Sequence, residues 1–231
     1  MILMPYVVHN EWWLEQAARV DRAAVRHSWN IPADASVFLF CTKLQSWKRP
    51  QDLLRAFARA DVPGSYLVCA GDGPLKNELE AGAKALGIAD RIRFLGFVNQ
   101  SGLPQVYCAS DLLVLPSEYE PFGVVVNEMM LCGRGVIVSD RVGAKFDLIR
   151  ARETDFVYPC GDIEVLARLL PSVLSDSGAL RRYGEAAQQR MTEWSPKAYV
   201  DTFVQGVRRA LNLRNSHSRD GPSSNPNFVG L

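Results

Sequence analysis

Short apolar runs alternate with longer helical patterns along the chain from Val37 onward. Most of these runs are continuously apolar, as expected of strands whose two sheet faces are both covered by helices. Strands separated by helices are typical of repeated βαβ units and a parallel sheet. We therefore predict an α/β fold with a doubly wound, Rossmann-like parallel sheet. The six predicted strands are Val37–Cys41, Tyr66–Ala70, Ile92–Leu95, Leu112–Leu115, Val136–Val138 and Phe156–Tyr158.

The intervening helical patterns carry start signals, either a proline in the first turn or an oxygen-bearing cap residue. Two further helices are predicted after the last strand, the second with Ser195 as its cap before Pro196. The predicted helices begin near Pro50, Pro74, Ser101, Phe122, Ala144 and Asp162, and the two later ones span Gly178–Met191 and Pro196–Leu211.

The two ends of the chain differ from this repeat. Glu11–Asn30 is an amphipathic stretch with three tryptophans, and it predicts an N-terminal helix packed on the sheet edge. Residues 212–231 are rich in Ser, Asn, Pro and Gly, which predicts a disordered tail because they bury too little apolar surface. The expected organisation is residues 1–36 as linker and N-terminal helix, 37–211 as the Rossmann-like domain, and 212–231 as tail.

Charge and cysteine content exclude several classes of protein. With 26 basic and 25 acidic residues the formal net charge is +1, so no long-range field attracts nucleic acid or an anionic bilayer. No run approaches the ~20 apolar residues of a transmembrane helix. The expected location is cytoplasmic, with attachment to the inner membrane face left open. Five cysteines, without zinc-site spacing, are predicted to be buried thiols: Cys41, Cys69, Cys108, Cys132 and Cys160.

Candidate ligand-binding residues follow the predicted strands. In an open parallel sheet, ligands bind at the carboxyl ends of the strands. Lys43 and Lys48 follow the first strand, and Gly71 follows the second. The loop after the fourth strand contains Glu120 and opens the helix that carries Glu128. We expect these residues to meet at one edge of the sheet.

Glu120 and Glu128 occupy different settings, the first in a loop and the second about two turns up a helix. They are therefore not expected to act as an acid–base couple on one substrate atom. Glu128, an acceptor when ionised, suits a vicinal diol such as ribose. Backbone N–H groups at the helix start suit a diphosphate or sugar hydroxyls, and these belong to Phe122, Gly123 and Val124.

The Glu-x7-Glu spacing within PSEYEPFGVVVNEMMLCG resembles the signature of family 4 glycosyltransferases. The resemblance runs from about Val37 to Leu211. It is supported by AGDGPLKNELE, RIRFLGFV and YPCGDIEVLA, and PYVVHN is similar to the end of that family's interdomain linker. A lone GxG such as Gly71–Gly73 would be weak evidence. The resemblance implies the C-terminal, donor-binding half of a two-domain GT-B architecture.

The resemblance also implies a role for each candidate residue. Lys43 and Lys48 would neutralise the donor diphosphate as leaving group, without a metal ion. Glu120 would meet the donor sugar, and Glu128 would bind the ribose. Val98 would lie beside the base, and the backbone N–H groups of the helix start would contact sugar and diphosphate. Gly71 completes the predicted donor-binding residues.

The implied activity is retaining transfer of a sugar from a UDP- or GDP-sugar to an acceptor sugar, lipid or small molecule, with no cofactor. The resemblance implies that the acceptor domain, with its glycine-rich loop and active-site histidine, is not part of this chain, and His9, His27 and His217 are not expected to replace that histidine. The chain is therefore expected to be inactive alone. Two alternatives remain: a non-catalytic nucleotide-sugar-binding module, and a nucleotide-sugar epimerase on the same fold. An intact upstream reading frame would separate a truncated enzyme from a free-standing module.

Some positions depart from the family pattern. Thr42-Lys43 stands where many members have Gly-Arg, which keeps the charge but loses the bidentate fork. Gly133-Arg134-Gly135 replaces a common Gly-x-Pro and is not expected to reach the site. Asp155 stands where glycine is frequent, which predicts a strained turn. Taken without the family pattern, Lys43, Lys48 and Glu118 would be interpreted as solvated loop charges.

Overall fold

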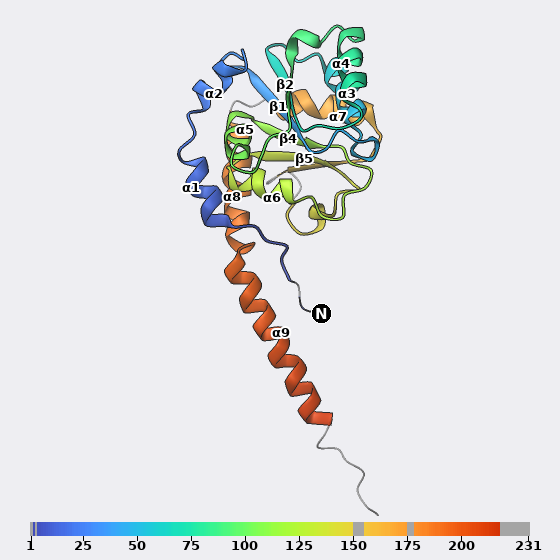
Figure 1. The fold of residues 1–231 in the computed structure, drawn as a ribbon. Coiled ribbons are helices and arrows are strands. Elements are labelled where there is room, and N and C mark those ends of the chain that lie inside the picture. Colours follow the sequence, from blue (N-terminus) through green and yellow to red (C-terminus); the bar gives the residue numbers. More distant parts are fainter. Residues whose placement is uncertain (1, 3, 150–154, 175–177, 218–231) are drawn as a thin grey trace, which may run out of the picture.

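A six-stranded parallel sheet forms the centre of the molecule (Figure 1). The computed structural model describes residues 2, 4–149, 155–174 and 178–217. The strand order β3-β2-β1-β4-β5-β6 reverses direction between β1 and β4, which makes the sheet doubly wound. Every predicted strand is confirmed to within one residue at each end. The strands are β1 Ser36–Cys41, β2 Ser65–Ala70, β3 Ile92–Gly96, β4 Leu112–Leu115, β5 Gly135–Ser139 and β6 Asp155–Tyr158.

Helices cover both faces of the sheet and divide its core in two. Along β1, Val37 and Leu39 face one layer, whereas Phe38 and Phe40 face the other, and all four are buried. This arrangement explains why the strand sequences are continuously apolar. The first layer contains α5 (Leu103–Ala109), α6 (Val124–Leu131) and α8 (Ala179–Glu193), and the second contains α3 (Pro50–Ala60), α4 (Lys76–Ala85) and α7 (Ile163–Ser172).

The single helix predicted over Glu11–Asn30 is wrong, because this stretch forms two helices. They are α1 (Asn10–Ala17) and α2 (Arg22–Ser28), and both pack against α5. The break has a local cause. The Asp21 carboxylate accepts a hydrogen bond of 3.0 Å from the Ala24 N–H, so it caps a new helix start and competes with continuation of the first helix.

The helix predicted near Ala144 is also wrong, since only a short 3₁₀ turn, Gly143–Phe146, is present. The backbone there is paired with the loop after β4. Gly143 donates to the Glu120 carbonyl at 2.9 Å, and Ala144 donates to the Phe122 carbonyl at 2.8 Å. These bonds hold the segment against the loop and leave it too constrained to wind into an α-helix. Asp155 itself begins β6, and the turn before it lies outside the described residues.

A buried arginine joins α2 to the sheet. The Arg26 side chain is 1% exposed, and its guanidinium donates to the Ala109 carbonyl at 2.8 Å, to the Ala35 carbonyl at 2.6 Å and to Asp111 at 2.7 Å. The same Asp111 oxygen accepts the Val37 N–H at 2.7 Å. One ion pair therefore fastens α2, the end of α5 and the start of β1 together.

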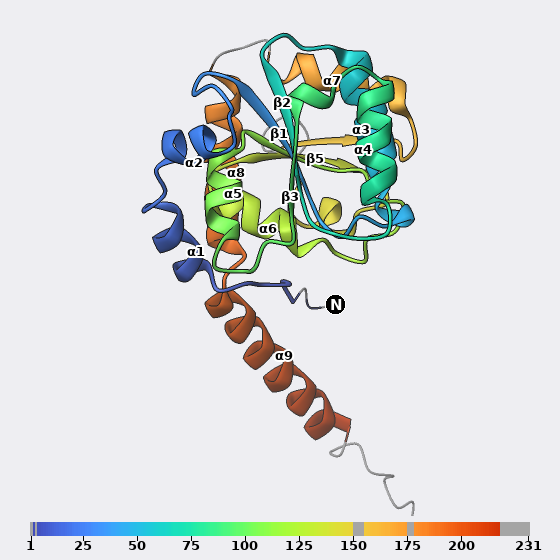
Figure 2. The ribbon, with the colours of Figure 1, turned by 45° about the horizontal axis from the view of Figure 1, so that its top comes forward.

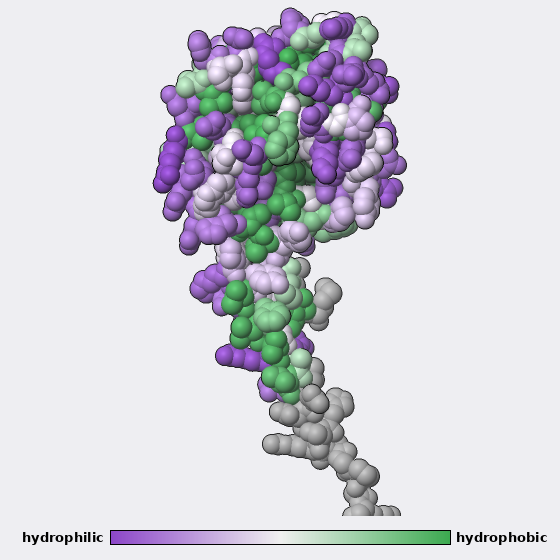
Figure 3. Space-filling view, in the orientation of Figure 1, coloured by the Kyte–Doolittle hydropathy of each residue, from purple (hydrophilic) through white to green (hydrophobic). Residues whose placement is uncertain are grey.

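The last helix, α9 (Pro196–His217), projects away from the body as a rod (Figures 1 and 2). The predicted end at Leu211 is wrong, because the helix continues to His217, and the rest of the predicted tail lies outside the described residues. Apolar side chains gather on its surface (Figure 3). Across the described residues we find no helix with the length and apolar content needed to cross a bilayer. The exposed apolar residues of α9 are Tyr199, Val200, Phe203, Val204, Val207 and Leu211.

The prediction of buried thiols is confirmed for four cysteines, while Cys160 is only partly buried. Burial raises the pKa of Cys41 and of Cys69 to about 12, since a thiolate loses its hydration inside the core. These two thiols are therefore inert at neutral pH and act as small apolar residues.

Candidate functional site

A cavity of about 440 Å³ opens at the carboxyl edge of the sheet. It lies between the loops that follow β1, β2 and β3 and the helices α5 and α6, which is where ligands bind in doubly wound folds. Its lining combines one lysine and two carboxylates with an apolar wall. The lining residues are Cys41, Thr42, Lys43, Gln45, Ala70, Gly71, Asp72, Gly73, Phe97, Val98, Leu103, Tyr107, Val125 and Glu128.

Two glycines after β2 bring the first two loops into direct contact. A Cβ atom at Gly71 would lie 2.0 Å from the Thr42 carbonyl oxygen, and one at Gly73 would lie 2.5 Å from the Leu44 carbonyl oxygen. Only glycine permits this approach of backbone to backbone. Gly71 also donates its N–H to the Gly96 carbonyl at 2.8 Å. The Gly-x-Gly element therefore shapes the cavity floor by packing.

Four predicted site residues line this cavity: Lys43, Gly71, Val98 and Glu128. They come from the segments after β1, β2 and β3 and from α6, so residues far apart in sequence converge as the strand–helix repeat predicted. Lys43 is exposed, whereas Val98 and Glu128 are partly buried. The cavity thus has a cation, a carboxylate and an apolar side chain on its walls.

Glu128 is held by a buried tyrosine. The Tyr107 hydroxyl donates a hydrogen bond of 2.7 Å to one carboxylate oxygen of Glu128. Burial raises the pKa of Glu128 above its ordinary value, and the Tyr107 hydrogen bond opposes that rise by stabilising the carboxylate. Tyr107 was not singled out from the sequence, because its place in an apolar helical segment gives no local sign of a polar partner.

Lys48 and Glu120 lie outside the cavity lining and form an ion pair with each other. Their side chains are 13% and 16% exposed, so the pair is well shielded from solvent. Glu120 is also bridged through its backbone to Val142. For Lys48 to contact a diphosphate and Glu120 a sugar, as predicted, this ion pair must first open.

The start of α6 is a separate feature beside the cavity. Gly123 has a left-handed φ of +98° and precedes Val124, the first residue of the helix. Within the described part of the chain, no acceptor is found for the backbone N–H groups of Phe122, Gly123 and Val124. Phe122 stacks on Tyr6 with ring centroids 4.8 Å apart. Glu128 lies about one turn into α6, not two as predicted, because the helix begins at Val124.

Phe97 is a further lining residue that the sequence interpretation passed over. It follows β3 directly, lies within the RIRFLGFV segment and is 79% exposed at the cavity. Its position directly after a predicted strand, where ligand-binding loops lie in a parallel sheet, was the available sequence signal. As for metals, the described residues contain no group of three His, Cys, Asp or Glu side chains that could hold an ion.

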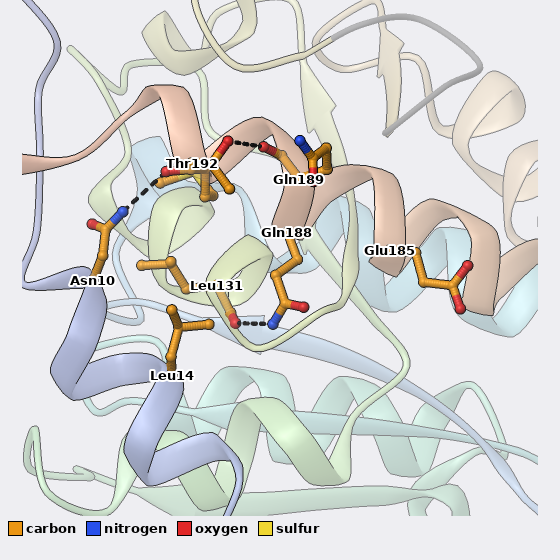
Figure 4. Close-up of a pocket in the computed structure, with 8 residues that line it drawn as sticks. Asn10, Leu14, Leu131, Glu185, Gln188, Gln189 and Thr192 are labelled. Carbon is orange, nitrogen blue, oxygen red and sulfur yellow. Dashed lines mark hydrogen bonds between the residues drawn. The ribbon is translucent and has the colours of Figure 1, made fainter. Parts of the chain in front are cut away.

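A second cavity, of about 320 Å³, lies between α1, the end of α6 and α8 (Figure 4). No predicted site residue lines it. The Asn10 amide donates to the Met191 carbonyl at 3.0 Å, and the Gln188 amide donates to the Leu131 carbonyl at 3.0 Å. These bonds attach the N-terminal segment to α8 and α8 to α6.

Solved structures share this architecture, which is that of the C-terminal half of GT-B proteins. The C-terminal domain of the group 1 glycosyl transferase LpcC from Francisella tularensis matches with a TM-score of 0.67 and 24% identity, over 74% of this chain and 91% of that one. HepE of Anabaena, solved in complex with UDP-glucose, matches with a TM-score of 0.76 and 22% identity, over 89% of this chain and 57% of that one. These likenesses show the fold.

Sequence comparison shows the family. The family model described as glycosyl transferases group 1 matches residues 21–190. A D-inositol 3-phosphate glycosyltransferase of Streptomyces bingchenggensis is 32% identical over 91% of this chain and 50% of its own length. An uncharacterized glycosyltransferase of Methanocaldococcus jannaschii is 36% identical over 68% of this chain and 40% of its own. The chain belongs to the group 1 glycosyl transferases, as their C-terminal domain, and spans about half the length of the curated relatives it matches.

Proposed function

We propose that the cavity at the carboxyl edge binds a nucleotide sugar as the donor site of a retaining glycosyltransferase. The observation that carries the proposal is the convergence of Lys43 and Glu128 on one hollow beside the unpaired N–H groups of α6. Glu128 accepts hydrogen bonds from the ribose hydroxyls, and Val98 and Phe97 contact the base. Lys43 and the N–H groups at the start of α6 compensate the diphosphate charge.

Lys48 and Glu120 complete the donor site at the sugar end. In their ion pair the charges cancel, so the pair adds little attraction for a diphosphate while it stays closed. Binding of the donor separates them. Lys48 then turns to the departing phosphate oxygens, and Glu120 accepts hydrogen bonds from sugar hydroxyls. The energy that the lost ion pair costs is offset by these new charge-assisted bonds.

The proposed reaction transfers a sugar from a UDP- or GDP-sugar in a cleft between this domain and an upstream acceptor domain. The family resemblance supports retention of the anomeric configuration. The buried thiols favour a cytoplasmic location for the reaction. Relatives such as the D-inositol 3-phosphate glycosyltransferase of Streptomyces bingchenggensis have the additional length that such a domain requires. The identity of the acceptor is decided by that other half.

Binding of the nucleotide is expected to need no divalent metal. Isothermal titration of the chain with UDP, GDP and ADP, with and without a chelator, measures this directly. We expect at least one nucleotide to bind with the same affinity in both conditions, because lysine and backbone N–H groups meet the diphosphate charge. Binding that depends strictly on added magnesium or manganese would contradict the proposed site.

Glu128→Ala is expected to weaken nucleotide affinity more than Glu120→Ala does. The first removes a charged acceptor for two ribose hydroxyls, whereas the second acts mainly at the sugar. Hydrogen bonds to charged groups contribute about 1.5–3 kcal/mol, which predicts a roughly tenfold to hundredfold loss in Glu128→Ala.

The matched control is Glu118→Ala. Glu118 comes from the same loop as Glu120, but its side chain is 62% exposed and pairs with Arg49 at 3.3 Å. Its removal should leave UDP and GDP affinity within about twofold of wild type. Equal affinities for UDP or GDP in all three variants and wild type would refute the assignment of Glu128 to ribose.

A further inference from the structure

The Tyr107 hydroxyl is a buried polar group whose partner is the carboxylate of Glu128, the proposed ribose-binding residue. Tyr107 is 1% exposed, and its hydroxyl donates to Glu128 at 2.7 Å. On its other side, the Cys41 thiol donates weakly to the same hydroxyl at 3.6 Å. The hydroxyl is therefore satisfied as both donor and acceptor. Phenylalanine would fill the same space in the core, so the hydroxyl bears on Glu128 rather than on packing.

We propose that Tyr107 is a positioning residue that fixes the Glu128 carboxylate for the ribose hydroxyls of the donor. This inference rests on the proposed donor site. The Tyr107 bond occupies one lone pair of one carboxylate oxygen and leaves the rest of the carboxylate available to ligand. It also limits rotation of the Glu128 side chain before ligand arrives, so less conformational entropy is lost on binding.

Tyr107 is itself held in place by the N-terminal segment. The Trp13 ring lies 5.5 Å from the Tyr107 ring, measured between centroids, and is 1% exposed. Trp13 belongs to α1, and Asn10 at the start of α1 is bonded to the end of α8 (Figure 4). Helix α1 thus supports the Glu128 carboxylate through the ring contact of Trp13 with Tyr107 and the hydrogen bond of Tyr107 to Glu128.

The charge environment of Glu128 makes the effect of this bond measurable. The ionisable groups around its carboxylate are Tyr107, Cys41 and Cys132, and Lys43 and Asp72 line the same cavity. Both thiols have a raised pKa and stay neutral at pH 7. Loss of the Tyr107 hydroxyl removes the hydrogen bond that lowers the pKa of Glu128. The pKa of Glu128 then rises further. As the pH is lowered, the carboxylate is protonated at a higher pH than in wild type, and the ribose contact weakens there.

The test compares Tyr107→Phe with wild type by titration against UDP and 2′,3′-dideoxy-UDP, or against the corresponding guanine pair if the chain selects GDP. Wild type is expected to prefer UDP roughly tenfold or more. In Tyr107→Phe, we expect UDP affinity to fall about threefold to fivefold while the dideoxy analogue stays within about twofold, so that a smaller preference for UDP remains. As the pH is lowered, the preference for UDP should disappear at a higher pH in the variant than in wild type, because the Glu128 carboxylate is protonated earlier.

Tyr158→Phe is the matched control. Tyr158 is also 1% exposed, but its hydroxyl has no hydrogen-bond partner in the described structure, and it does not line the cavity. Removal of the Tyr158 hydroxyl should change neither the affinity for UDP nor the affinity for the dideoxy analogue. If wild type binds both nucleotides equally, the ribose assignment of the donor site fails and this inference fails with it. If wild type discriminates but Tyr107→Phe discriminates equally well, or loses both ligands equally, the positioning role alone is refuted.

Discussion

The 231-residue chain is expected to bind a nucleotide sugar and yet to transfer less than about a thousandth of the sugar that a two-domain relative transfers under the same conditions. The proposed roles of the residues that converge on the cavity all concern the donor. Neither His9 nor His27 lines that cavity. Transfer requires two reactants to be held in register and water to be excluded, and one open face provides neither condition.

Incubation of the purified chain with radiolabelled nucleotide sugars and a panel of sugar, lipid and small-molecule acceptors measures transfer directly. A two-domain relative assayed in parallel is the positive control, and released free sugar reports hydrolysis. Addition of a separately expressed acceptor domain should restore turnover. Glycoside product at the control's level from this chain alone would overturn the proposed division between two domains.

Arg26→Ala is expected to destabilise the fold by about 3–5 kcal/mol, the usual cost of removing one partner from a buried ion pair. The loss would leave Asp111 as a buried carboxylate without its main cation, and it would also leave the Ala35 and Ala109 carbonyls without these donors. Urea unfolding followed by circular dichroism gives the free energy of unfolding for each variant.

Arg22→Ala is the control for this effect. Arg22 pairs with the other oxygen of Asp111, but its side chain is 31% exposed. Because solvent can replace a partly exposed partner, its removal should cost about 1 kcal/mol or less. Equal losses in both variants would mean that burial of Arg26 contributes nothing beyond an ordinary surface pair.

The strands could be predicted because their signal is local. Val114 and Ile137 lie in short runs of apolar residues, which are typical of strands in a sheet covered on both faces. The break between α1 and α2 has a local cause, the Asp21 cap, which the sequence interpretation missed. Other features depend on nonlocal contacts. The turn at Gly143 depends on hydrogen bonds to the loop containing Glu120, and the junction at Arg26 depends on Asp111, far along the chain. Neither partner is visible in a window of neighbouring residues.

The site was predicted in part for a related reason. That Lys43, Gly71 and Glu128 line one cavity follows from a general rule, the position of loops and helix starts at the carboxyl edge of a parallel sheet, whereas Val98 was proposed from the family resemblance. How side chains pair within that edge does not follow. Two pairings join separate elements, that of Lys48 with Glu120 and that of Tyr107 with Glu128. A spacing along the sequence cannot specify either of them.

The projecting α9 determines how the protein behaves as a particle in solution. At 22 residues it is about 33 Å long, so the molecule is a sphere with a rod attached and sediments more slowly than a compact protein of its mass. Its tyrosine, phenylalanine, valines and leucine meet water along one side of that rod. We therefore expect this helix to favour self-association of the purified chain, since the charge-balanced body contributes little colloidal repulsion at a net charge of +1.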